Sequence, residues 1–168
     1  MTTRLLLAAK NREDVIVRFA ARHGIRLLRI SIGVVFLWFA IPKYLPGVSP
    51  VDALVRHTVD TLTFHVVPGN LGCHLLAVVE TGIGLGMLTG RLLRLTLVLL
   101  LLQMAGTLTP LLLFPREMFA SSGVLTMEGQ FIMKNLVIIA AGITLTATLR
   151  GGGLVASERA VRLDRESS

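Results

Sequence analysis

The chain has little charge, few aromatic rings and almost no cysteine. Of its 168 residues, 16% are charged, 5% are aromatic and 53% are hydrophobic, and its mean hydropathy is +0.73. A soluble domain of this length needs a more polar surface, so the composition excludes an ordinary water-soluble fold. The single cysteine, Cys73, excludes a disulfide within the chain and a CxxC redox pair.

Residue patterns typical of several cofactor sites are also missing. His74 is the only histidine in an apolar block and has no facing mate for b-type haem. No group of residues has metal-ligand spacing, and no Ser–His–Asp arrangement can be drawn. The run from Gly82 to Met87 differs from a dinucleotide fingerprint, because its third glycine comes one place early and no βαβ unit surrounds it. We therefore assign no catalytic residue and no metal ligand.

What the sequence does have is four apolar blocks. Each is about 19 to 23 residues long, which suffices for a helix to cross a hydrocarbon core of about 30 Å. The blocks are Leu27–Leu45, Leu71–Thr89, Leu92–Phe114 and Phe131–Leu149. Only Gly90 and Arg91 separate the second block from the third, which predicts a tight antiparallel hairpin, and the three glycines after Arg150 predict where the fourth helix ends. The four blocks predict an all-α, integral membrane four-helix bundle over residues 25–150, with a basic segment at 1–24 and a tail at 151–168.

Basic residues flank these blocks. The formal charge is +7 and the pI about 11.0, but the cations do not lie beside aromatic stacking groups, so we expect anionic lipid headgroups and no nucleic acid as partners. Thirteen of the seventeen Lys and Arg residues lie on one side of the predicted bundle: eleven precede the first block, lie between the second and third, or follow the fourth, and Arg29 and Arg94 are the third residues of the first and third blocks. By the positive-inside rule, both termini are predicted to be cytoplasmic.

Two segments are predicted to lie along the membrane surface. Residues 11–23 place Arg18 and Arg22 opposite Val15 and Phe19, as in a cationic interfacial helix. On the outer face, an N-cap at Ser49 begins a short amphipathic helix that we expect to cover the bundle. Its proline, capping acid and apolar positions are Pro50, Asp52, Val51, Leu54, Val55, Val59 and Leu62.

Glu80 is the most informative polar residue, because it lies in the middle of the second block. A charged side chain there costs about 2.5–3.5 kcal/mol, so it should face the bundle and have a partner or a proton. Glycines surround it on the same helix. Gly84 shares its face, whereas Gly82, Gly86 and Gly90 follow the opposite face at four-residue spacing, a pattern of close helix packing or of a subunit interface.

Polar residues in the other three blocks are candidate partners for Glu80. We expect Lys43, Gln103 and Lys134 to meet it in one mildly positive pocket that opens outward and suits a quinone carbonyl or a small anion, with Asn135 beside Lys134. Three alternatives stay open. Lys43 can be an interfacial lysine, Lys134 can pair with Glu128 or a headgroup, and a Glu80–lysine pair can be purely structural.

Four stretches of the chain form a recognisable pattern: Arg29–Phe39 with Lys43, Glu80–Gly84, Thr109–Pro115 and Leu125–Val137. They resemble the DoxX-like family of small bacterial membrane proteins, in particular its YkgB/RclC-type branch. The resemblance covers about three-quarters of the chain, from Ile25 to about Leu149.

The resemblance implies a four-helix protein of the bacterial inner membrane that is accessory to a redox or oxidative-stress system. The family's acid and lysines would correspond to Glu80, Lys43 and Lys134, with Glu128 and Gln130 in an outer-loop motif beside Asn135. No cofactor motif accompanies them, so quinone is the one candidate cofactor and catalysis by this chain alone is not expected. The alternatives are a DoxD-like subunit of a quinone-linked oxidoreductase with a separate redox partner protein, and a structural or transport homo-oligomer.

Overall fold

The computed structural model describes residues 2–45 and 52–154, with side chains from residue 15 onward. Within that part of the chain, four helical segments are long and apolar enough to cross a membrane: Val15–Tyr44, Gly69–Thr89, Leu93–Leu113 and Met127–Arg150. Only 17–39% of each segment is buried inside the protein. Most of the apolar side chains therefore face outward, as expected of a multi-pass protein whose surroundings are lipid.

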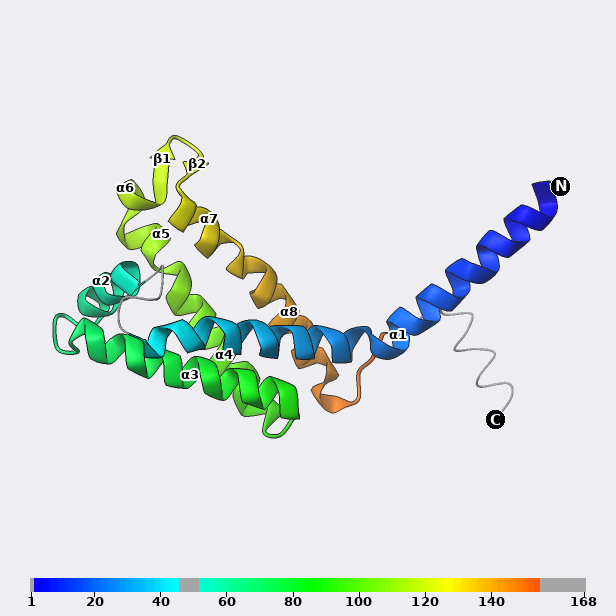
Figure 1. Cartoon of the computed structure of the whole chain (residues 1–168), viewed down its shortest axis with the longest axis horizontal. Helices are drawn as coiled ribbons and strands as arrows, with labels where there is room; N and C mark the ends of the chain where they lie inside the picture. The colour runs from blue at the N-terminus through cyan, green and yellow to red at the C-terminus, as the bar shows by residue number, and fades with distance from the viewer. Residues whose placement is uncertain (1, 46–51, 155–168) are drawn as a thin grey trace.

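The first membrane segment belongs to one long helix, α1 (Thr2–Ala40), followed by the 3-10 turn η1 (Ile41–Tyr44). The surface helix predicted at 11–23 is continuous with the first span, so no helix boundary separates the two. Figure 1 shows this helix running well beyond the bundle. The helix ends near Pro42, whose ring removes a backbone donor and favours the tighter turn that follows.

The second and third segments form the predicted tight hairpin. Helix α3 (Gly69–Thr89) ends at Gly90, which adopts the left-handed conformation at φ 69°. The guanidinium of Arg29 lies against Gly90, where a positive charge complements the carbonyl end of α3. Helix α4 (Leu93–Leu108) follows, and α5 (Pro110–Leu113) completes the third segment after Pro110 interrupts the backbone ladder.

The fourth segment consists of α7 (Met127–Met133), α8 (Asn135–Ala147) and the 3-10 turn η2 (Thr148–Arg150). Lys134 lies between the two α-helices. The segment ends at Gly151, which is left-handed at φ 87°, so the stop predicted from the glycines after Arg150 is confirmed. Between the third and fourth segments lie α6 (Pro115–Met118) and an antiparallel hairpin that the all-α prediction lacked, β1 (Phe119–Ser121) and β2 (Val124–Leu125).

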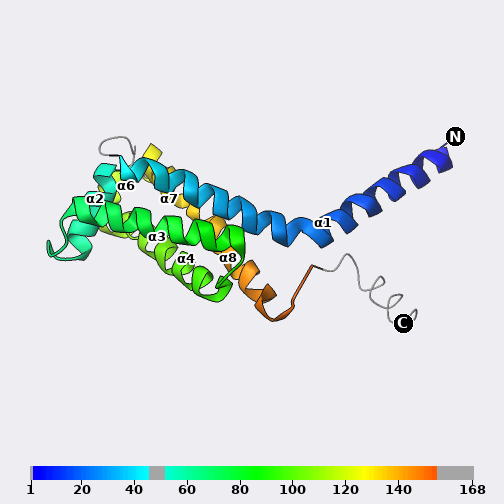
Figure 2. The same cartoon turned by 60° about the horizontal axis from the view of Figure 1, so that its bottom comes forward.

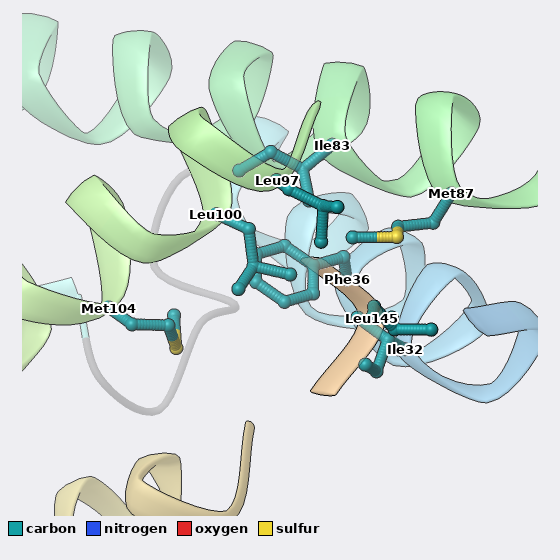
Figure 3. Close-up of a cluster of buried hydrophobic side chains, with 8 residues drawn as sticks. All are labelled: Ile32, Phe36, Ile83, Met87, Leu97, Leu100, Met104 and Leu145. Atoms are coloured by element: carbon teal, nitrogen blue, oxygen red, sulfur yellow. The ribbon is translucent and has the colours of Figure 1, made fainter. Parts of the chain in front are cut away.

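The four spans pack in the order α1, α3, α4, α8 (Figure 2). Helix α1 runs along most of α3 but touches α8 only slightly. A cluster of buried apolar side chains fills the space among the four helices (Figure 3), with Phe36 contributed by α1. Its other members are Ile32, Ile83, Met87, Leu97, Leu100, Met104 and Leu145.

The glycines of α3 serve contacts within the chain. A Cβ at Gly84 would lie 2.7 Å from Leu37 and 3.0 Å from the carbonyl oxygen of Gly33, so this glycine allows α1 and α3 to approach closely, as predicted. Gly86 packs against Thr96 of α4, and Gly90 ends the helix. Of the glycines on the face considered for a subunit interface, Gly82 is the one whose Cβ would meet nothing within 4 Å.

Helix α2 (Asp52–Leu62) lies across one end of the bundle, which we call the α2 end (Figure 1). The predicted amphipathic helix is thus confirmed over 52–62, whereas its predicted cap at Ser49 and Pro50 lies outside the described residues. The β1–β2 hairpin lies at the same end. The α3–α4 turn and the end of α8 lie at the opposite end, which carries Arg91, Arg94 and Arg150.

Candidate functional site

A buried ion pair joins the last turn of the first span to the middle of the second span. Lys43 Nζ lies 2.7 Å from Glu80 Oε2 and 3.0 Å from Oε1, and it also donates to the carbonyl oxygen of Phe39 at 3.0 Å. The exposed fractions of the two side chains are 6% and 10%. The interpretation of Lys43 as an exposed interfacial lysine is therefore wrong. The prediction that Glu80 faces the bundle and has a partner is confirmed.

Gln103 brings the third span into the same cluster. Its Nε2 donates to Glu80 Oε1 at 3.0 Å, so one carboxylate accepts hydrogen bonds from residues of two other spans. The amide oxygen of Gln103 is buried and has no hydrogen-bond partner among the described residues. Thr107, one turn further along, donates to the backbone carbonyl of Gln103 at 2.9 Å. Three of the four predicted pocket residues thus converge.

Lys134 does not join them. Its side chain is exposed, and its Nζ lies 5.2 Å from the centroid of the Phe131 ring. The predicted pairing of Lys134 with Glu80 is therefore wrong, and the cluster holds one cation and one anion instead of a positive excess. Glu128 and Gln130 are also exposed. Gln130 donates to the backbone oxygen of Leu125 at 3.3 Å, which ties α7 to the hairpin.

A cavity of about 290 Å³ lies beside the cluster. Lys43, Glu80 and Gln103 provide polar groups on one part of its wall, and Asn135 provides a further amide from α8. Most of the remaining wall is apolar and comes from α1, α2, α4, α5 and α7. Its other lining residues are Val35, Phe36, Phe39, Leu54, Val55, Thr58, Val59, Leu62, Leu76, Met104, Gly106, Thr107, Pro110, Phe131, Ile132 and Ile138.

Sequence reasoning missed the aromatic part of this wall. Phe39 and Phe131 meet edge to face, with ring centroids 5.3 Å apart, although they come from the first and fourth spans. Phe39 precedes Lys43 by one helical turn, which is a usable signal for a shared face. Phe131 carries no comparable signal, because its orientation depends on how α7 leans against the other helices.

Ion pairs stabilise both ends of helix α2. Asp52 pairs with Arg56 one turn later, with Arg56 Nη2 2.6 Å from the carboxylate, and the hydrogen bond from Arg56 holds the pKa of Asp52 below its ordinary value of 3.8. Near the other end, His65 Nδ1 lies 2.6 Å from Asp60 Oδ2 where the chain turns toward α3. Cys73 is buried beneath the start of α2, with its Sγ 4.0 Å from the backbone oxygen of Asp52.

The four apolar helices mark a multi-pass membrane protein in contact with lipid. A scan against protein-family models, a search of curated proteins and a search of solved structures each find no match. The ion pair, the amide groups beside it and the cavity that they line are therefore the features from which we infer a function.

Proposed function

We propose that this chain is an inner-membrane protein of the DoxX-like type that binds a quinone headgroup in its intramembrane cavity, as an accessory component of a redox or oxidative-stress system. The observation that carries the proposal is a charged pair buried in the wall of an otherwise apolar cavity. Two charges inside a membrane protein cost desolvation energy that ordinary packing does not require. Protein interiors are also close-packed, so a cavity of about 290 Å³ beside such a pair is a natural ligand site.

The charge balance of the cluster selects between the two ligand classes considered from sequence. With Lys134 outside, Lys43 and Glu80 neutralise each other, and a free anion gains no net attraction. A quinone is neutral, its ring suits apolar and aromatic walls, and its carbonyl oxygens accept hydrogen bonds. The amide of Asn135 is the donor that we assign to one of those carbonyls, since the three acceptors around Lys43 Nζ already match the three N–H donors of its ammonium. Glu80 is the group that would hold a proton beside the quinone.

The proposed orientation places both termini in the cytoplasm. Arg91, Arg94 and Arg150 lie at the end of the bundle opposite α2, and α1 extends from that end with Arg18 and Arg22 on it. This arrangement puts the basic residues on one side, as the positive-inside rule requires. The α2 end is then the outer end of the bundle.

Ligand-dependent stability tests the proposal. The purified protein in lipid nanodiscs is heated with a short-tailed benzoquinone and, separately, with an aromatic hydrocarbon of matched size and tail. A quinone present at about 100 times its Kd stabilises the fold by about 2.7 kcal/mol, which appears as a higher unfolding temperature. We expect quinone, and not the hydrocarbon, to stabilise the protein.

Two variants locate the effect. Asn135→Leu removes a cavity amide without leaving a charge unpaired, and it should abolish most of the quinone-dependent shift. Lys134→Met changes the neighbouring residue, whose ammonium lies outside the polar cluster, and should retain the shift. Equal stabilisation by quinone and hydrocarbon, or an Asn135→Leu protein that responds like the native one, would show that the cavity does not bind quinone.

A further inference from the structure

The cavity is covered at the α2 end of the bundle. Val55, Thr58 and Val59 of α2 form part of its wall. Helix α2 is held against α3 where Val59 packs on Gly72, so closely that a Cβ at Gly72 would overlap it. On its other side, the ring of His57 stacks on Phe114 with centroids 4.1 Å apart and planes 17° apart. For a ligand to enter along the bundle axis from this end, α2 would have to break its contacts with both Gly72 and Phe114.

The opposite end of the cavity is closed by the apolar core. Phe36 lies at the boundary, because it lines the cavity and also belongs to the buried cluster. Beyond it, Ile83, Leu100 and Leu145 are completely buried and fill the space among the helices (Figure 3). No axial route from this end remains through the described part of the bundle.

One side of the cavity is more open. Val35 and Phe39 both line the cavity, yet their exposed fractions are 38% and 40%, so they mark where the cavity reaches the protein surface. Phe39 lies toward Phe131 of α7, and among the neighbouring spans α1 and α8 pack together least extensively. Figure 1 shows α7 leaning away from α1 toward the α2 end. The edge-to-face pair of Phe39 and Phe131 bridges this side.

We infer that the cavity opens sideways into the bilayer between α1 and α7–α8, and that its ligand has an apolar tail that leaves through this opening. The inference depends on the proposed function for the headgroup and adds the class of ligand and its route. Val35 and Phe39 lie within the first membrane segment and Phe131 within the fourth, so the opening faces hydrocarbon. A ligand that enters from hydrocarbon must be lipid-soluble, and about 290 Å³ accommodates a headgroup but not a long tail as well.

The α4 side is the competing exit. Leu62 and Gly106 also line the cavity and are exposed there, and a Cβ at Gly106 would meet nothing within 4 Å. We favour the α1 side because α3 and α4 pack together more extensively than α1 and α8 do.

Photo-crosslinking tests the route. A quinone that carries a decyl tail with a diazirine midway along the tail, beyond the cavity wall that the headgroup contacts, is bound to the native protein in nanodiscs, with excess untailed quinone as competitor. We expect competed crosslinks on α1 around Val35 and on α7–α8 around Phe131. Competed crosslinks on α2, or around Leu62 and Gly106, would overturn the sideways opening between α1 and α7–α8 while leaving headgroup binding intact.

A plugging variant and a matched control provide a second readout. Val35→Trp fills the proposed opening and should weaken binding of the tailed quinone at least tenfold, while untailed quinone binds within about twofold of its native affinity. Val34→Trp places the same side chain at the neighbouring residue, which is 51% exposed and does not line the cavity, and should leave both affinities within about twofold. A Val35→Trp protein that binds the tailed quinone as tightly as the Val34→Trp protein, or a native protein that binds untailed but not tailed quinone, contradicts the inference alone. Failure of both quinones to bind the native protein overturns the proposed function together with it.

Discussion

The buried pair of Lys43 and Glu80 yields a prediction about coupling that does not depend on any ligand. Replacing either residue alone with Met leaves the other charge without its partner, in a site where the side chains are only 6% and 10% exposed. Such an uncompensated charge costs about 3–5 kcal/mol. The double variant Lys43→Met/Glu80→Met removes both charges and restores apolar packing. It should therefore be far more stable than the sum of the two single losses implies.

We expect a coupling energy of about 3 kcal/mol between the two substitutions. The hydrogen bond from Gln103 is lost in Glu80→Met and in the double variant alike, so it cancels in the cycle. Unfolding by SDS in mixed micelles, monitored by circular dichroism, gives the free energies of unfolding of the native protein, the two single variants and the double variant. The control cycle pairs Glu80→Met with Lys134→Met, which should be additive within about 0.5 kcal/mol. A Lys43–Glu80 coupling below about 0.5 kcal/mol would refute the buried pair.

Three further predictions concern packing and the α2 end. Gly84→Ala should destabilise the fold by about 1–3 kcal/mol in the SDS titration, because its Cβ meets α1, whereas Gly82→Ala should be neutral or stabilising by up to about 1 kcal/mol; equal effects would contradict the close α1–α3 contact. Cys73 is 2% exposed, so a maleimide should label it slowly in the folded protein and rapidly after SDS denaturation; fast labelling of the folded protein would show that α2 does not cover it. Because Arg56 lowers the pKa of Asp52, this pair contributes stability that is present above pH 3.8 and lost as the pH falls further. Asp52→Asn should therefore be less thermally stable than the native protein at pH 6, with the difference shrinking below pH 3.8; a gap that widens in acid would contradict this sign.

Much of the architecture could be predicted from the sequence because hydrophobic length is a strong physical signal. Apolar blocks long enough to cross a bilayer predicted the four spans, and the glycines after Thr89 and Arg150 predicted where two of them end. The regular apolar spacing after Asp52 predicted α2. Residues 119–125 have no such signal, since a hairpin of this size depends on a left-handed Gly123 and on contacts with α6 and α7.

The polar site was predicted in part for a similar reason. The cost of a carboxylate in a membrane places Glu80 inside the bundle without further information. Gln103 follows from its depth in the neighbouring span. Which lysine reaches Glu80 depends on local geometry, because the 3-10 turn after α1 directs Lys43 inward, while Lys134 sits between α7 and α8 and extends over Phe131. The composition of the sequence predicts neither where α1 ends before Lys43 nor where α7 ends before Lys134.

Equilibrium binding of a short-tailed quinone to the nanodisc-embedded protein tests the central claim most directly. We expect saturable binding of one quinone per chain, retained in Lys134→Met and lost in Asn135→Leu. Uptake that rises linearly with quinone concentration, and is the same in empty nanodiscs and in both variants, would mean that the quinone partitions only into lipid and that the cavity beside Glu80 does not hold it.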